Sequence, residues 1–435
     1  MRSRRSEKES MYNQEIIEKL GPAFAEAFGE GGAAEAACYF APGRANLIGE
    51  HIDYNGGCVL PCSLAMGTYA AARKRPDRVL RFFSVNFPGD GVVCSSLDDL
   101  RPLEDHSWTA YIKGVIWALG NRGIELDCGM DMVICGDMPD GAGLSSSASL
   151  EVLAGFVIGD LFGLPLEKRE LAVCCQEAER GYVGVDCGIM DQFACAAGRE
   201  GCAMVLDTVS LECRYVPLDF PEIGLVITNT NRKHDLRTSA YNERRQQCAE
   251  ALEVVRRCGM VPEVARQGSE TLEVAGRCTA APEIAQQCGN FQALCDVTPA
   301  EFAAMESAFD DPVLLRRARH AVRENDRVRQ AAEALKNGQI EILGKLMNES
   351  HRSLKEDFEV SCRELDILAE TAQELPYVLG SRMMGGGFGG CTISLVRKDA
   401  LDEFKQTLRE VYREQTGIEC TFYEASPGGG PARVR

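Results

Sequence analysis

Residues Asp131–Gly163 read DMVICGDMPDGAGLSSSASLEVLAGFVIGDLFG and contain the most informative pattern for the fold. The first five residues form a short apolar run typical of a strand. After a glycine-rich turn, four aliphatic residues recur at helical spacing: Leu150, Leu153, Val157 and Leu161. Serines at the head of that run are good N-caps. The segment therefore predicts a strand, a glycine loop and a helix.

The loop PDGAGLSSSAS, residues 139–149, has the chemistry of a phosphate site. Glycines let the backbone present consecutive N–H groups, and the following helix adds the positive end of its dipole. It is not a Walker A loop, because the Gly-Lys-Ser/Thr ending is absent. A purely structural role, as a glycine C-cap followed by a serine N-cap, explains these residues equally well when they are taken alone.

On either side of this segment, the spacing of apolar residues predicts a series of helices and strands. An amphipathic helix is expected over 13–28, a hairpin over 80–93 around Pro88-Gly89-Asp90-Gly91, and strands over 201–216 and 224–228. Further helices are expected over 167–182, 237–258, 315–335, 341–349 and 365–375. The interval after 216 predicts a boundary between two domains, 1–220 and 221–435. We expect the last ten residues, SPGGGPARVR, to be frayed.

A second glycine run, GGGFGG at Gly385–Gly390, precedes a β-prone segment over 391–396. Five glycines in six residues indicate close approach to a backbone or to a ligand. A compact strand entry or bulge explains the run equally well.

The third motif, APGRANLIGEHIDYNGG over 41–57, packs short polar groups into a turn-rich segment. A polyhydroxylated ligand needs such donors and acceptors, because each buried hydroxyl must be matched. The alternative is a solvated loop. Interspersed aliphatic residues weigh against it: Leu47, Ile48, Val59 and Leu60.

Carboxylates form a fourth group, with Glu177 and Glu179 near the end of one predicted helix and Asp191 shortly after it. Metal-assisted phosphoryl transfer needs an oxygen ligand for Mg²⁺ and a second carboxylate near the accepting hydroxyl. On these residues alone, a solvated helix charge and a helix cap remain the alternative.

Composition excludes several classes of protein. The 435 residues are 45% hydrophobic and 26% charged, as in a soluble globular chain of roughly two or three domains. A net charge of −18 disfavours nucleic acid and anionic membranes as partners. No export signal or bilayer-length apolar run occurs, so we expect a cytoplasmic protein whose 20 cysteines are reduced. With five histidines and no Cys-x-x-Cys pair, a zinc cage has little support.

Together, these segments resemble the GHMP superfamily of small-molecule kinases and, within it, the galactokinase family. The resemblance covers almost the whole chain in the family's order. It rests on GRANLIGEHIDYNGG, GAGLSSSAS, EAERGYVGVDCGIMDQ, TNTNRKHDLRTSAYNERRQQC, ARHAVRENDRV, MNESHRSLKEDFEVSCRELD and RMMGGGFGGC. The resemblance implies an α/β (α+β) two-domain GHMP kinase fold with the active site in the interdomain cleft. It also implies transfer of the ATP γ-phosphoryl group to the C1 hydroxyl of α-D-galactose, giving galactose 1-phosphate and ADP.

Roles carry over from the family by position. Asp191 would accept the sugar hydroxyl proton and Arg44 would hold that carboxylate ionised; Ser147 and Glu179 would bind Mg²⁺. The sugar would be bound by Glu50, His51, Asp53, Gly188 and Tyr241. The ATP phosphates would be bound by Gly141, Ala142, Gly143, Leu144, Ser145, Ser146, Ser147, Gly386 and Gly387.

Three departures from the family pattern bear on specificity. Ile52 replaces the Thr common in galactokinases, as also happens in N-acetylgalactosamine kinases. Met384 stands where the family usually has Thr, which either alters a hydroxyl contact near the phosphates or adds packing. The segment 261–289 is longer than usual, and we expect a surface excursion there without a catalytic role. A kinase for N-acetylgalactosamine or another aldose, and a non-catalytic sugar sensor, are the alternatives.

Overall fold

The computed structural model describes residues 12–29, 35–101, 107–139, 143–164, 166–232, 237–259 and 291–435. The chain forms two compact units. The first unit consists of Met1–Ala45, Cys62–Ala203 and Ala425–Arg435, and the second of Asn46–Pro61 and Met204–Glu424. The units are thus interleaved along the sequence, and the predicted domain division at residue 220 stays a prediction.

The first unit is built on a six-stranded sheet in the order β13-β1-β3-β6-β4-β5. Its strands are β1 (Ala37–Asn46), β3 (Pro61–Lys74), β4 (Val79–Ser84), β5 (Val93–Ser96), β6 (Met130–Gly136) and β13 (Ala432–Arg433). Strands β4 and β5 pair antiparallel, with a 3-10 turn η1 (Pro88–Asp90) between them. The predicted hairpin is therefore confirmed.

One face of this sheet is covered by α2 (Gln14–Phe28), the predicted amphipathic helix. Its apolar stripe, which includes Leu20 and Phe24, packs against Phe40, Tyr69 and Val133 of the sheet. Leu20 and Phe24 are fully buried. Burial of each such side chain stabilises the unit by about 1.5–3 kcal/mol.

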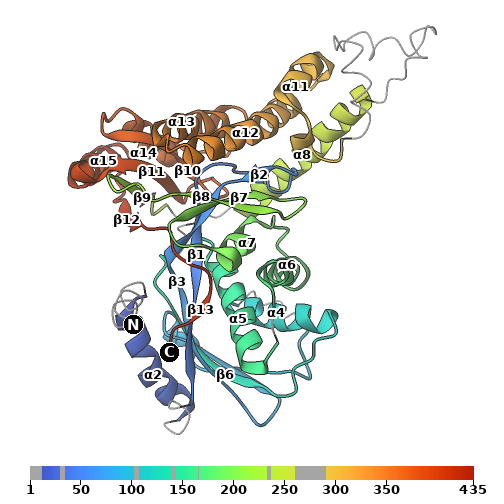
Figure 1. The fold of residues 1–435 in the computed structure, drawn as a ribbon, viewed down its shortest axis with the longest axis vertical. Helices are drawn as coiled ribbons and strands as arrows, with labels where there is room; N and C mark the ends of the chain where they lie inside the picture. The colour runs from blue at the N-terminus through green and yellow to red at the C-terminus, as the bar shows by residue number, and fades with distance from the viewer. Residues whose placement is uncertain are drawn as a thin grey trace, which may run out of the picture. The chain divides into compact units, whose positions relative to one another are not determined.

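Four helices lie on the other side of the sheet (Figure 1). They are α4 (Thr109–Asn121), α5 (Ser146–Phe162), α6 (Lys168–Ala178) and α7 (Met190–Ala197). Tyr39 of β1 points to this side, where its ring meets Phe156 of α5 and its hydroxyl donates to Asp160 at 2.7 Å. The strand–loop–helix prediction around residues 131–163 is confirmed by β6 and α5.

Helix α6 does not end at Ala178 but widens into a π-helical turn, η2 (Glu179–Val183). Such a turn rotates the side chains that follow it relative to a regular α-helix, and it is common at functional sites. The predicted single helix over 167–182 is therefore two elements, and Glu179 stands at their junction.

The second unit contains a four-stranded sheet, β10-β11-β9-β12, and a three-stranded sheet, β2-β7-β8. The strands are β2 (Cys58–Val59), β7 (Cys202–Asp207), β8 (Cys213–Pro217), β9 (Ile223–Asn229), β10 (Val378–Met384), β11 (Cys391–Arg397) and β12 (Thr421–Ala425). The helices are α8 (Arg237–Gly259), α11 (Pro299–Met305), α12 (Pro312–Lys336), α13 (Ile340–Glu356), α14 (Arg363–Gln373) and α15 (Leu401–Thr416). Short 3-10 turns are η5 (Leu294–Asp296), η6 (Glu306–Ala308) and η7 (Lys398–Ala400).

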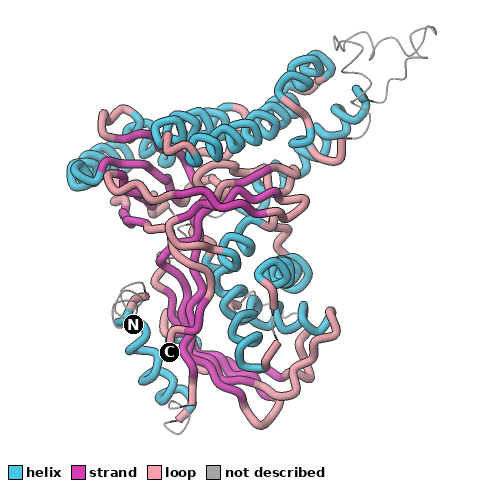
Figure 2. The backbone as a smooth tube through the Cα atoms, in the orientation of Figure 1, coloured by secondary structure: helices cyan, strands magenta, loops and turns pink. Residues whose placement is uncertain are grey.

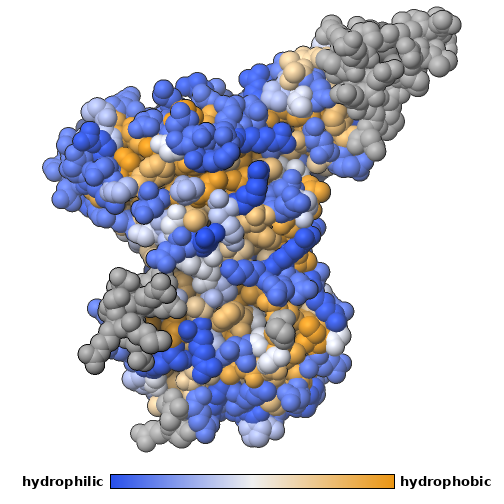
Figure 3. Space-filling model, viewed as in Figure 1, coloured by the Kyte–Doolittle hydropathy of each residue, from blue (hydrophilic) through white to orange (hydrophobic). Residues whose placement is uncertain are grey.

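Helices α14 and α15 bury their apolar faces against the four-stranded sheet. Leu368, Phe404 and Tyr412 pack with Val226 and Val396 in one core. Figure 2 shows the second unit's helices gathered on one side of these strands. The outward surface of α12, α13 and α15 is mainly hydrophilic (Figure 3), as expected for amphipathic helices with one buried face.

The C-terminus is ordered rather than frayed, contrary to the prediction. Strand β13 pairs antiparallel with β1, with Arg433 opposite Tyr39 and Ala432 opposite Phe40. The Cys38 carbonyl accepts from Val434 N at 2.8 Å, and the Cys38 N–H donates to Arg435 O at 2.9 Å. The tail covers the hydrogen-bonding edge of β1, which would otherwise be an exposed edge.

The excursion predicted over 261–289 lies outside the described residues. None of the helices in the described ranges is both long and apolar enough to cross a membrane.

Candidate active site

An arginine–carboxylate pair joins two distant parts of the first unit. Nε of Arg44, at the end of β1, donates to Oδ1 of Asp191 at 2.8 Å, and Nη2 donates to Oδ2 at 2.8 Å. Arg44 is 4% exposed, whereas the Asp191 side chain is 31% exposed. This bidentate geometry fixes the carboxylate while leaving part of it open to a ligand. The structure thus brings together the two residues predicted to be catalytic.

The same arginine anchors the glycine loop that precedes α5. Arg44 Nη1 donates to the carbonyl of Gly143 at 2.6 Å, and the Ser145 hydroxyl donates to Asp191 Oδ2. Ser145 has φ +59°, a left-handed backbone that is uncommon outside glycine. Gly141 and Ala142 lie outside the described residues.

Glu179, Gln192 and Glu151 form a buried polar cluster beside this loop, on three different helical elements. Gln192 Nε2 of α7 donates to Glu151 Oε2 of α5 at 3.1 Å and also to Glu179 Oε2. The Ser147 hydroxyl, in the first turn of α5, lies close enough to the Glu179 carboxylate to lower its pKa slightly. The predicted metal ligands Ser147 and Glu179 are therefore neighbours.

The carboxyl groups of the cluster resist ionisation, because they are buried close to one another. Burial, and then the charge of Asp191, raise the pKa of Glu179 to about 7. Burial, and then Glu179, raise the pKa of Glu151 well above its usual range. Tyr111 of α4 is close enough that burial and the charge of Glu179 raise its pKa to about 12. A cation at this place would be electrostatically favoured.

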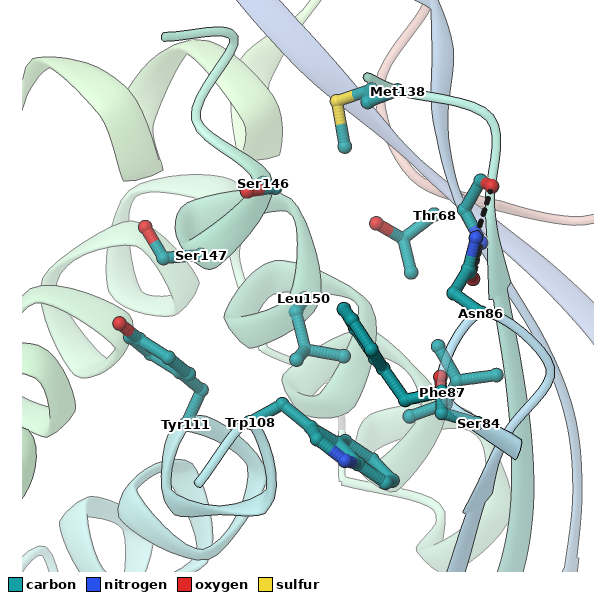
Figure 4. A pocket seen from close by; sticks show the side chains of 12 residues that line it. Thr68, Ser84, Asn86, Phe87, Trp108, Tyr111, Met138, Ser146, Ser147 and Leu150 are labelled. Carbon is teal, nitrogen blue, oxygen red and sulfur yellow. Dashed lines mark hydrogen bonds between the residues drawn. The ribbon is translucent and has the colours of Figure 1, made fainter. Parts of the chain in front are cut away.

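A pocket of about 240 Å³ opens next to the first turn of α5. Phe87, Trp108 and Leu150 point into it, and the Tyr111 hydroxyl lies on the side of Ser147 (Figure 4). Several polar groups of its lining are already paired. The Asn86 amide exchanges two hydrogen bonds with the backbone of Gly136, and Trp108 Nε1 donates to Asp90. Stacking on aromatic rings is what this wall offers a ligand.

In the second unit, Glu50 of the third motif (residues 41–57) contacts the second glycine run, Gly385–Gly390. Its Oε1 lies 2.7 Å from Arg382 Nη2 and accepts from the backbone N–H of Gly385 at 2.8 Å. Both charged side chains are buried, so the ion pair is held in a low dielectric.

His51 stands next to Glu50 within a group of aromatic rings. Its Nδ1 lies 2.8 Å from the Tyr54 hydroxyl, and its ring centroid lies 5.6 Å from that of Tyr241. Its backbone has φ +63°, again a left-handed conformation. Burial, and then the neighbouring His320, lower the pKa of His51 to about 3, so the ring is neutral at pH 7.

The remaining predicted residues fall into the same two groups. A Cβ on Gly386 would lie 3.8 Å from the Tyr241 ring, and Gly387 has φ +79° and packs against Val360. Asp53 Oδ1 accepts from Tyr54 N at 3.1 Å. Gly188 is in the first unit, three residues before Asp191.

The two departures from the family pattern that the structure describes are both packing residues. Ile52 is fully buried, and a Cβ on Gly57 would lie 2.8 Å from its Cδ1. Met384 is 1% exposed and pairs with Cys391 across β10 and β11. Of the two explanations for Met384, an altered hydroxyl contact near the phosphates or added packing, the structure supports packing.

Among the described residues, His351, Asp366 and Glu370 also gather ligand atoms within 4.8 Å of one another. His351 Nδ1 accepts from the Met383 N–H at 3.2 Å, so Nε2 carries the hydrogen and faces Asp366. The ammonium of Lys355 contacts both carboxylates. This group fastens α13 to α14 through the contacts of Lys355.

Sequence reasoning missed four residues of the first unit's site: Phe87, Trp108, Glu151 and Gln192. Glu151 was detectable in principle, because it is a carboxylate within the otherwise apolar run of α5. Phe87 and Trp108 carried no local signal, because only the fold brings the η1 turn next to α4.

Family models match three parts of the chain. A galactokinase galactose-binding signature matches residues 22–74, the N-terminal domain of GHMP kinases matches 110–199, and their C-terminal domain matches 331–414. A galactokinase of Clostridium perfringens strain SM101 is 43% identical over 396 residues, covering 91% of this chain and 95% of the relative. A galactokinase of Bacillus subtilis is 42% identical over 418 residues, covering 96% and 99%.

Solved structures of other kinases are similar in fold to this chain. A crystal structure of Lactococcus lactis galactokinase with galactose matches with a TM-score of 0.86 and 40% identity, covering 96% of this chain and 100% of that one. A mevalonate kinase from Methanococcus jannaschii shares only the fold, with a TM-score of 0.54 and 15% identity over 90% of this chain and 98% of that one. The predicted GHMP kinase fold is confirmed.

Proposed function

Because this chain belongs to the galactokinase family of the GHMP kinases, we propose that it transfers the γ-phosphoryl group of ATP to the C1 hydroxyl of α-D-galactose. The products are galactose 1-phosphate and ADP. The observation that carries the proposal is the Arg44–Asp191 pair, which is tied to the loop before α5 through Gly143 and Ser145. Since ATP is kept inside cells, a cytoplasmic location is part of the proposal.

Asp191 is the proposed proton acceptor. Oδ2 accepts from both Arg44 and Ser145, whereas Oδ1 accepts from Arg44 Nε. Each carboxylate oxygen has two lone-pair directions, so one direction of Oδ1 is left for the sugar hydroxyl. As the hydroxyl attacks phosphorus, its proton passes to that oxygen.

Arg44 has a double role in the proposal. It holds the Asp191 carboxylate by two hydrogen bonds, and its positive charge would offset the negative charge that develops on the transferred group. A loose phosphoryl-transfer transition state needs positioning and charge compensation more than covalent chemistry. A bidentate guanidinium supplies both, and a lysine at the same place could not reproduce its planar fork.

Ser147 and Glu179 are the proposed ligands of Mg²⁺. A hydroxyl and a carboxylate are hard oxygen donors, which Mg²⁺ binds together with water and phosphate oxygens. The excess of buried carboxylates around Glu179 fits a divalent cation. When bound, the ion would neutralise charge on the ATP phosphates.

The nucleotide is proposed to bind with its base in the aromatic pocket and its phosphates at the first turn of α5. Phe87 and Trp108 offer ring faces for stacking, and Ser146 and Ser147 line the same pocket. The N-terminus of this 17-residue helix favours negative charge. ATP as the phosphoryl donor follows from the kinase family.

The sugar is proposed to bind through Glu50, His51, Asp53, Gly188 and Tyr241. A neutral, buried imidazole and carboxylate oxygens suit hydroxyl groups, which donate and accept at once. Because the Ile52 side chain is buried, it is not placed to select between galactose and N-acetylgalactosamine by contact. Nothing in its position favours the second sugar.

The test is release of ADP with a panel of sugars, including galactose, N-acetylgalactosamine and arabinose. The proposal expects the highest kcat/KM with galactose. A higher value with N-acetylgalactosamine would overturn the substrate while leaving the reaction intact. Absence of turnover with every sugar, in protein that still binds galactose, would favour a sensor.

A further inference from the structure

The buried amide of Gln192 joins two carboxylates that come from different helical elements. Its single nitrogen, Nε2, donates to Glu151 Oε2 at 3.1 Å and to Glu179 Oε2. A primary amide has two N–H groups, so both are used. Gln192 and Glu151 are fully buried, and Glu179 is 6% exposed. Water therefore cannot easily replace these hydrogen bonds.

Two further atoms indicate how the contact is completed. Glu151 Oε1 and Gln192 Oε1 are buried and have no hydrogen-bond partner. Both are acceptors if Glu151 is a carboxylate, and two unsatisfied acceptors in one contact are costly. A hydrogen on Glu151 Oε1 would turn that oxygen into a donor, which Gln192 Oε1 could accept. Glu151 then forms an acid–amide pair with Gln192, which a glutamine at position 151 could imitate.

Gln192 thus contacts Glu151 on one side and Glu179 on the other, and the Ser147 hydroxyl lies near the Glu179 carboxylate. A carboxylate at the end of a long side chain rotates freely unless one oxygen is fixed. Here Gln192 holds Oε2, while Cys187 and Ser147 also lie next to the Glu179 carboxylate. Outer hydrogen bonds of this kind typically change metal affinity 10–100-fold when they are removed.

We propose that Gln192, supported by Glu151, is a positioning residue that orients the Glu179 carboxylate to bind the divalent cation of the nucleotide. The inference rests on the proposed function, in which Glu179 is a cation ligand. Neither Gln192 nor Glu151 touches the substrates in this proposal. Their effect passes entirely through Glu179.

The test measures cation binding directly, by water-proton relaxation with Mn²⁺ and ADP, in protein that has not turned over. Gln192→Met keeps the length of the side chain but removes both N–H donors. We expect it to raise the dissociation constant of Mn²⁺ about 10–100-fold. Glu151→Met should weaken binding in the same direction, because Gln192 loses its support. Glu151→Gln, the matched variant, should stay within about twofold of the wild type.

The KM for galactose adds a readout that general damage would not spare. We expect it to change by less than about twofold in folded Gln192→Met, while the Mg²⁺ concentration needed for half-maximal rate rises with the Mn²⁺ dissociation constant. Folding is checked by circular dichroism and the unfolding midpoint.

Unchanged Mn²⁺ binding in folded Gln192→Met would overturn the inference. Where Gln192→Met does not fold, equal Mn²⁺ binding by Glu151→Met and Glu151→Gln would overturn it instead. Glu179→Ala separates this inference from the proposed function. If Glu179→Ala binds Mn²⁺ as tightly as the wild type, the cation assignment itself fails. If it loses binding and Gln192→Met does not, only the positioning role fails.

Discussion

The buried carboxyl group of Glu179 makes the stability of the cation-free protein depend on pH in an unusual direction. Burial, and then Asp191, raise the pKa of Glu179 from 4.5 to about 7. The folded state therefore favours the protonated acid. This contribution to stability is complete below the unfolded pKa of 4.5 and is lost as the pH rises through about 7. The whole difference corresponds to roughly 3 kcal/mol.

The measurement compares the wild type with Glu179→Gln, which has no titrating group at this position. The free energy of unfolding of both proteins is measured in the presence of EDTA at pH 5.5 and at pH 8. Both pH values lie above the isoelectric point, which is near 4.9. Buried histidines with lowered pKa values, such as His320, contribute equally to both proteins and cancel. The part of the effect between pH 5.5 and 7 is roughly 2 kcal/mol.

We therefore expect the wild type to lose roughly 2 kcal/mol relative to Glu179→Gln between pH 5.5 and pH 8. Mg²⁺ with ADP should stabilise the wild type more at pH 8 than at pH 5.5, because the cation binds the ionised carboxylate. A wild-type-minus-variant difference that is the same at both pH values would refute the reasoning about the burial of Glu179.

Three further predictions concern stability. Asp131→Asn should cost about 3 kcal/mol, because the fully buried carboxylate accepts from three arginines, Arg73, Arg75 and Arg81. Deletion of residues 430–435 should cost about 2–3 kcal/mol, since it removes the backbone hydrogen bonds along β1, each worth about 1 kcal/mol. Gly387→Ala should cost at least about 2 kcal/mol, because φ is +79° and a Cβ would lie 2.1 Å from the Val360 carbonyl oxygen.

Each of these is measured by the unfolding midpoint of the purified variant. An unfolding midpoint of Asp131→Asn equal to that of the wild type would contradict the stabilising role of Asp131. A truncated protein as stable as the full chain would show that β13 adds nothing to the sheet. For Gly387, the matched control is Gly386→Ala, because a Cβ at position 386 would make no such close contact. Equal stability of the two alanine variants would contradict the steric argument.

The sequence was sufficient wherever structure is set by local periodicity. The stripe of Ile16, Leu20 and Phe24 in α2 recurs every three or four residues, and one apolar face packed on a sheet is the physical consequence. The β4–β5 hairpin was equally accessible, because turn residues separate two β-prone runs. The pairing of Arg44 with Asp191, 147 residues apart, was predicted only through the family resemblance.

Long-range contacts without a local pattern were not predictable. Strand β13 has two residues in a glycine- and proline-rich tail, and it pairs with a strand almost 400 residues earlier. The sequence pattern of the tail does not predict such a strand, because the strand forms only by pairing with the edge of β1. Ser145 looked like a phosphate-binding residue of the loop, and only the fold places its hydroxyl on Asp191.

The central claim is that the Asp191 carboxylate accepts the proton of the sugar hydroxyl. It is tested most directly by Asp191→Asn, with galactose binding and ADP release measured on the same protein. The account predicts a kcat lower by about 10²–10⁴, with a galactose dissociation constant within a few-fold of the wild type. Turnover that survives the substitution unchanged would contradict it.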